Sequence, residues 1–171
     1  LASIQLQQHQ YQQLNTTLIA AIDLATHQQD ERELARLRLL LAQSYTETDR
    51  IEQALGVLTI AKTNAAKVKD WLTLGYISQL AGMINQRIGR NDEAREQFKK
   101  AIEYHQMMNY PIGQTQALNE LAELEVIEFN YPQAYRYINR SYEQVAHRGL
   151  DDLEKTTFKL MTKIENKMQH R

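Results

Sequence analysis

The sequence contains no cysteine and only two prolines and six glycines among its 171 residues. The absence of cysteine excludes disulfides, thiolate nucleophiles and cysteine-ligated zinc. The scarcity of proline and glycine disfavours turn-rich folds such as β-sandwiches and barrels. No run of about 18 apolar residues is present, so no segment is predicted to span a membrane. A formal net charge of −1 gives no electrostatic reason to expect nucleic acid or an anionic membrane as a partner.

The composition is typical of one helical globular domain. Hydrophobic residues make up 43% of the chain and charged residues 24%, a balance too apolar for disorder. Helix-forming residue types dominate. The N-terminal stretch LASIQLQQHQYQQ lacks the charged start and apolar centre of a signal peptide, and it lacks an initiator methionine. We therefore expect a cytoplasmic protein, either a processed chain or a segment of a longer one.

The sequence carries no motif for catalysis, for a cofactor or for a metal. It has no glycine-rich phosphate loop, no nucleophile elbow and no Cys/His pair. Its histidines lack the spacing of metal ligands; they are His9, His27, His105, His147 and His170. Glu120 and Glu123 can share a helix face, but paired surface acids are more often solvated than catalytic. We predict a non-enzymatic protein without cofactor or metal.

Helical periodicity runs through nearly the whole chain, and start signals divide it into about eight helices. Asp30 followed by Glu33, and Asp49 followed by Glu52, are predicted capping boxes. Further helix starts are predicted at Asp70, at Asn91 and, after Gly149, at Asp151. Two more are predicted at Asn109 and Asn130, because each of these asparagines is followed by Tyr-Pro. The predicted links are about two to four residues long, so neighbouring helices must pack antiparallel.

A forty-residue pattern repeats along the chain. The phrase GRNDEAREQFKKA, which begins at Gly89, has counterparts forty residues earlier and forty residues later. A small residue lets two helix backbones approach, and a large neighbour fills the gap beside the crossing. Small residues repeat on the first helix at Ala42, Gly82 and Ala122, and on the second at Ala54, Ala94 and Ala134, followed by bulky Leu58, Phe98 and Ile138 and by small Ala61, Ala101 and Ser141.

Over about residues 10–169 this pattern resembles the tetratricopeptide repeat family, with GRNDEAREQFKKA as the most similar phrase. The units here have forty residues, whereas the family's usual unit has about 34. The resemblance implies an all-α, right-handed superhelical solenoid of antiparallel helix pairs, formed as a single domain. The implied units are about 30–68, 70–108 and 110–148, with a half-unit at about 3–28 and a terminal helix at about 151–169.

The resemblance also implies a concave groove, lined by the first helix of each pair, that binds a peptide or protein segment. Side-chain amides there can hold a peptide backbone, and Tyr76 and Met83 can supply apolar contact. The predicted groove residues are Arg36, Gln43, Glu47, Tyr76, Gln79, Met83, Arg87, Gln116, Asn119, Glu123, Lys159 and Lys163, and Thr156 is a further candidate. The alternative is that these are solvated helix positions. We expect the module to be the sensing or scaffolding part of a larger regulatory or signalling protein.

One subtype of the family grips the C-terminal carboxylate of a partner with Lys and Asn at set groove positions. Those positions hold Leu39, Gln43, Leu80, Gln116 and Glu120 in this chain. Binding of such a C-terminus is therefore not expected.

Two side-chain stripes leave alternatives open. The first is a row of lysines, Lys155, Lys159, Lys163 and Lys167, which is either a solvated face near a helix C-terminus or a docking edge for an acidic partner. The second is the row Tyr131, Tyr135 and Tyr142. These tyrosines either pack against the next helix pair or mediate self-association, for example as a homodimer. The uncovered ends of the solenoid are the other surface through which the module could self-associate.

Overall fold

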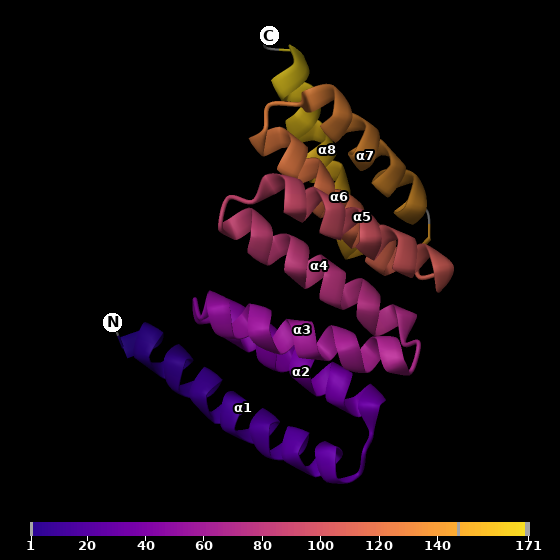
Figure 1. Ribbon diagram of the computed structural model, residues 1–171. Coiled ribbons are helices and arrows are strands. Elements are labelled where there is room, and N and C mark those ends of the chain that lie inside the picture. Colours follow the sequence, from indigo (N-terminus) through magenta and orange to yellow (C-terminus); the bar gives the residue numbers. More distant parts are fainter. Residues whose placement is uncertain (1, 147, 170–171) are drawn as a thin grey trace.

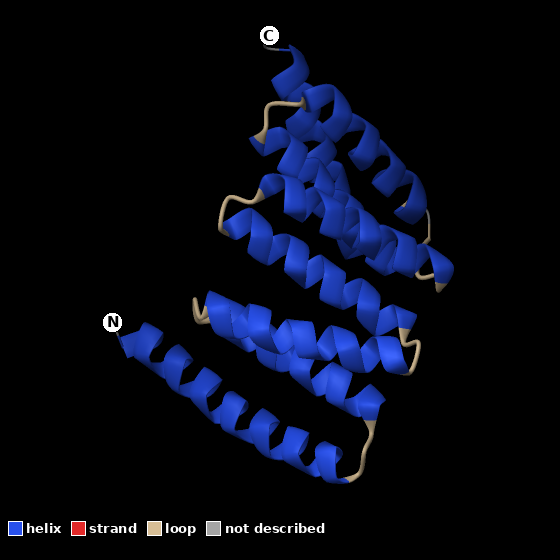
Figure 2. Ribbon diagram, in the orientation of Figure 1, coloured by secondary structure: helices blue, strands red, loops and turns tan. Residues whose placement is uncertain are grey.

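The chain is a succession of α-helices. The computed structural model describes residues 2–146 and 148–169, with side chains from residue 8 onward, and over these residues it contains eight helices and no strand (Figure 1, Figure 2). The helices are α1 (Ala2–His27), α2 (Glu31–Glu47), α3 (Ile51–Lys67), α4 (Trp71–Arg87), α5 (Asn91–Met107), α6 (Pro111–Ile127), α7 (Tyr131–Val145) and α8 (Asp151–Gln169). The predicted all-α class is confirmed.

The same backbone reversal recurs every twenty residues. Each helix from α2 to α6 has 17 residues, and a three-residue link follows it. The central residue of each three-residue link is left-handed, at Gln29, Asp49, Lys69, Gly89, Asn109 and Phe129. Gly149, in the longer link before α8, is left-handed as well, and all seven φ angles lie between 48° and 77°. In the link after α1, for example, the N–H of Asp30 bonds back to the carbonyl of Ala25 at 3.1 Å. This bond satisfies a carbonyl at the end of the helix.

Two of the predicted caps are confirmed. The side chains of Asp30 and Asp70 each accept a hydrogen bond from the backbone N–H three residues on, at the starts of α2 and α4. Pro111 is the first residue of α6 and Pro132 the second residue of α7, where a missing N–H costs no helical hydrogen bond.

Three other predicted caps are wrong. Asp49 occupies the left-handed position of its link, so Arg50 precedes α3 and no capping box forms. Asn109 likewise occupies the left-handed position of its link, and its side chain does not cap α6. Asn130 does precede α7, but its amide donates to Glu125 instead of capping the helix.

The helices stack as pairs along one axis, with the two termini at opposite ends (Figure 1). Helix α2 packs on α3, α4 on α5 and α6 on α7, while α1 and α8 cover the ends. Contacts also join α2 to α4, α4 to α6 and α6 to α8, whereas among the described residues α3, α5 and α7 do not contact one another. Helices α2, α4, α6 and α8 therefore form the inner face of a solenoid and are called the inner helices. The predicted solenoid of antiparallel pairs is confirmed.

The repeated small residues lie where paired helices cross. Ala54, Ala94 and Ala134 are fully buried, and so is Phe98. A Cβ atom placed on Gly82 would lie 2.5 Å from the Phe98 ring, so the ring occupies the space that a larger residue in α4 would need. The predicted packing of a small residue against a bulky one is confirmed at this crossing.

We predict that Gly82→Ala destabilises the protein by about 1–3 kcal/mol, because the new methyl group overlaps the Phe98 ring in a filled core. Gly56→Ala is the matched control, since nothing lies within 4 Å of a Cβ at Gly56 in α3. That change should stabilise the protein by about 0.5–1 kcal/mol through helix propensity. Urea denaturation followed by circular dichroism measures both. Equal changes in the free energy of unfolding for the two variants would contradict the close approach of Gly82 to the Phe98 ring.

Candidate functional site

The inner helices enclose a groove of about 700 Å³. Its lining comes from α2, α4, α6 and α8 and is made up of Gln43, Thr46, Glu47, Tyr76, Gln79, Leu80, Met83, Gln116, Asn119, Glu120, Glu123, Leu153 and Thr156. Many of these positions are forty residues apart, as in the series Tyr76, Gln116, Thr156 and the series Gln43, Met83, Glu123. The groove therefore displays equivalent positions of successive pairs side by side.

Eight of the twelve predicted groove residues line this space, namely Gln43, Glu47, Tyr76, Gln79, Met83, Gln116, Asn119 and Glu123, and so does Thr156. Sequence reasoning missed Thr46 and Leu153 as lining residues. It considered Leu80 only as a departure from the carboxylate-binding subtype, and Glu120 as such a departure and as one of a pair of surface acids. The forty-residue spacing contains a signal for Glu120, which occupies in α6 the position of Leu80 in α4.

The four remaining predicted residues lie elsewhere. The side chain of Arg36 points to Asp70, with 3.8 Å between Nε and Oδ2. Arg87 donates to the carbonyl of Thr46 at 2.7 Å, which holds it at the end of the groove beside Glu47. Lys159 and Lys163 line a separate hollow of about 630 Å³ on α8.

The amides of the groove differ in what they bind. Asn119 donates from Nδ2 to Thr157 at 2.9 Å and accepts a hydrogen bond from Ser141, so it ties α6 to α8 and α7. These bonds give Asn119 a structural role, and its role of holding a peptide backbone stays a prediction. The Oε1 atom of Gln79 is buried without a hydrogen-bond partner among the described residues, and Gln43 is exposed. The Gln43 amide is available to a ligand, whereas the buried oxygen of Gln79 becomes available only if its side chain turns.

Tyr76 is held in place from behind the groove. Its hydroxyl donates to the hydroxyl of Tyr110 at 2.8 Å, and its ring meets the edge of His105 with 5.1 Å between centroids. Burial, followed by the hydrogen bond with Tyr110, raises the pKa of Tyr76 above its usual value. His105 is fully buried, and burial lowers its pKa to about 4. The imidazole is thus neutral at physiological pH and acts as packing beneath Tyr76.

The charges that line the groove are all negative. They belong to Glu47 on α2 and to Glu120 and Glu123 on α6, and among the described residues no Lys, Arg or His lines the same space. Burial raises the pKa of Glu120 to about 7, and the charge of Glu123 adds to the shift. At neutral pH about half of the Glu120 carboxyls therefore remain protonated.

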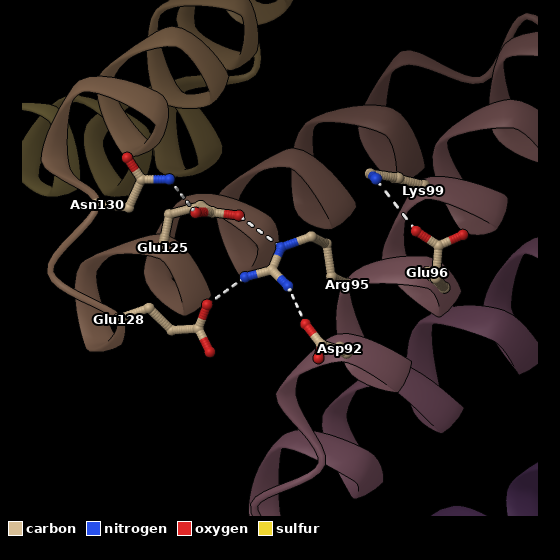
Figure 3. Close-up of polar contacts among 7 residues, drawn as sticks. All are labelled: Asp92, Arg95, Glu96, Lys99, Glu125, Glu128 and Asn130. Carbon is tan, nitrogen blue, oxygen red and sulfur yellow. Dashed lines mark hydrogen bonds and ion pairs between the residues drawn. The ribbon is translucent and has the colours of Figure 1, made fainter.

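Another acid of α6 has a different environment. Figure 3 shows Arg95 of α5 reaching Glu125, Glu128 and Asp92. The side chain of Glu125 is only 3% exposed, and Arg95 Nε lies 2.8 Å from its Oε1. Asn130 donates to the other carboxylate oxygen at 2.8 Å (Figure 3). The buried charge of Glu125 is compensated within the protein, while that of Glu120 is not. The ion pair of Arg95 with Glu125 joins α5 to α6, so its role is structural.

The tyrosine stripe lies largely inside the protein. Tyr131 is 7% exposed, and Tyr135 packs against the buried cluster that joins α6, α7 and α8. The Tyr142 ring lies 5.9 Å from the ring of Phe158, centroid to centroid. These contacts favour the packing alternative over an exposed tyrosine patch.

The described residues hold no group of three or more His, Asp or Glu side chains placed to share a metal ion. His147 and His170 lie outside the described residues. None of the described helices combines the length and the apolar character needed to cross a bilayer.

Comparison with known proteins gives a structural relative and nothing from sequence. No family model matches the chain, and no curated protein matches it. The crystal structure of BtubC (BKLC) from P. vanneervenii aligns with a TM-score of 0.83 at 18% sequence identity. The alignment covers 99% of this chain and 70% of that chain. At this identity the likeness shows the fold alone, an all-helical solenoid.

We predict that Glu120→Gln stabilises the protein at pH 8 by about 1–3 kcal/mol, a range set by the pKa shift and reduced for partial exposure. The pKa of Glu120 is about 7 in the folded protein against an ordinary 4.5, so the folded state favours the protonated form. The free-energy cost of the ionised Glu120 in the folded protein is therefore full above pH 7, and it disappears as the pH falls toward 4.5.

Urea denaturation at pH 8 and at pH 5 measures this difference, with Glu103→Gln on the exposed face of α5 as the matched control. The advantage of Glu120→Gln should be present at pH 8 and much smaller at pH 5, while the control changes little at either pH. A Glu120→Gln variant less stable than the wild type at pH 8 would show that the carboxylate is compensated after all.

Proposed function

We propose that this chain is a non-catalytic protein-interaction module of the tetratricopeptide type, which binds a peptide or protein segment in the groove of its inner helices. The groove itself carries the proposal: a space of about 700 Å³ crosses four helices and mixes amides, carboxylates and apolar side chains. Such a mixture suits an extended backbone flanked by side chains of varied character.

The unengaged groups of the groove support this function. Gln79 has a buried amide oxygen without a partner among the described residues, and Met83 is 39% exposed although it is a large apolar residue. Both line the groove. A bound segment would supply a donor to the first and cover the second. We propose further that the module is cytoplasmic and serves as the sensing or scaffolding part of a larger regulatory protein.

The test is selection of binders from a random nonapeptide display library, followed by fluorescence anisotropy with the enriched peptides. Gln43→Ala/Met83→Ala should weaken binding at least tenfold, since it removes one amide and one apolar contact from the groove. The matched control Gln53→Ala/Ile60→Ala removes the same kinds of group from the exposed face of α3 and should bind as the wild type does. Equal affinity of both variants, or no enriched peptide, would count against the groove.

Self-association is the alternative function, and one observation favours it. Phe158 is 52% exposed on α8, and it lines the hollow that also contains Lys159 and Lys163. A second copy that covered this hollow would give a mass that rises with concentration in light scattering, and Phe158→Ser should abolish the rise. A constant monomer mass up to millimolar concentration would remove this alternative.

A further inference from the structure

The groove is acidic, and the acidic lining continues beyond it. Glu47, Glu120 and Glu123 line the groove. A neighbouring hollow of about 390 Å³ shares Gln116 and Leu153 with the groove and is also lined by Asp151 and Asp152. Among the described residues, neither space is lined by a Lys, Arg or His side chain. The chain as a whole is nearly neutral, with a formal net charge of −1, so the groove and the neighbouring hollow concentrate charge of one sign.

The pair Glu120 and Glu123 is the least compensated part of this surface. Within the described residues neither forms an ion pair, and their carboxylates repel each other. At the opposite end, Arg87 lies beside Glu47, where it binds Asp49 at 3.2 Å and the Thr46 carbonyl. The middle of the groove has no such cation.

A second, independent feature of the groove calls for a hydrogen-bond donor. Gln79 lines the groove together with Glu120, and its buried Oε1 atom lacks a partner among the described residues. A buried carbonyl oxygen without a donor costs about 1–3 kcal/mol. Lysine and arginine side chains carry only donors and no acceptor.

This oxygen is itself buried, so the uncompensated carboxylates of Glu120 and Glu123, and not the amide, carry the preference for a cationic ligand.

We infer that the groove selects a protein segment that carries a lysine or arginine, whose cationic head lies against Glu120 and Glu123. The inference rests on the proposed groove-binding function and specifies its partner. An acidic segment would be repelled by the lining carboxylates, and a neutral one would desolvate them without compensation. The apolar stem of a lysine or arginine can pack on Leu80, Met83 and Leu153 between the acids.

This recognition depends on pH, because the cation binds the ionised form of Glu120. The other titratable groups that line the groove are Glu47 from α2, Tyr76 from α4 and Glu123 from α6, and the lining residues of α8, Leu153 and Thr156, carry no charge. With the pKa of Glu120 at about 7, the ionised fraction falls from about nine-tenths at pH 8 to about one-tenth at pH 6. Affinity for a cationic segment should fall about tenfold over this range.

The experiment uses four fluorescein-labelled nonapeptide pools, random except for a central Lys, Arg, Gln or Glu. Anisotropy is measured with the full chain at pH 8 and about 50 mM salt, where ion pairs are weakly screened. The Lys or Arg pool should bind at least tenfold more tightly than the Glu pool. Glu120→Gln/Glu123→Gln should remove this preference, and the matched control Glu52→Gln/Glu103→Gln, on the exposed outer faces of α3 and α5, should keep it. For the Lys pool, Glu120→Gln alone should remove the dependence on pH.

Each outcome bears on one of the two proposals. Pools that bind the wild type with no preference for a basic centre would overturn the inference and leave groove binding intact. Loss of the preference in the control variant as well would assign it to net charge, which also overturns the inference. If no pool binds the wild type, while the circular dichroism of the protein shows it folded, both the inference and the groove function fail.

Discussion

The structure depends on one backbone constraint, the left-handed residue at the centre of each three-residue link. With 17-residue helices this link gives a period of twenty residues, so every second helix repeats after forty. Equivalent positions of the inner helices then face the same space. Tyr76, Gln116 and Thr156 meet in the groove for this reason. One residue inserted within an inner helix would turn the side chains that follow it by about 100° about the helix axis and away from this space.

Two acids on α6 show how the solenoid separates stability from binding. Glu125 is buried against α5 and α7, and Arg95 and Asn130 satisfy it from both sides. Removal of one partner from such a pair is costly because the other charge remains buried. Glu120 lies on the inner side of the same helix, and its charge has no partner among the described residues, so its pKa rises to about 7. Only the second kind of acid gains from an external cation.

The sequence predicted the helices and their pairing because the small and bulky crossing positions repeat strictly, as at Gly82 and Phe98. It predicted the length of the links but not their conformation, since Gln29, Lys69 and Phe129 give no signal for the left-handed region. Asp49 was assigned wrongly because aspartate favours both helix caps and the left-handed conformation. In the groove, helical spacing identified the lining, but it could not show that Asn119 is engaged by Ser141 and Thr157. Such partners come from other helices and depend on three-dimensional packing.

The fold leaves the binding chemistry open, and this is why the groove must be interpreted from its own residues. A chain with 18% identity adopts the same fold with a TM-score of 0.83, because crossings require only residues of suitable size and the links tolerate several residue types. The groove positions accept an even wider range of residue types. Leu80 and Glu120 are equivalent in successive pairs, yet one is apolar and the other acidic. A half-buried acid at a position where the solenoid accepts leucine has no structural requirement behind it. The proposed binding of a basic segment would offset its cost to folding.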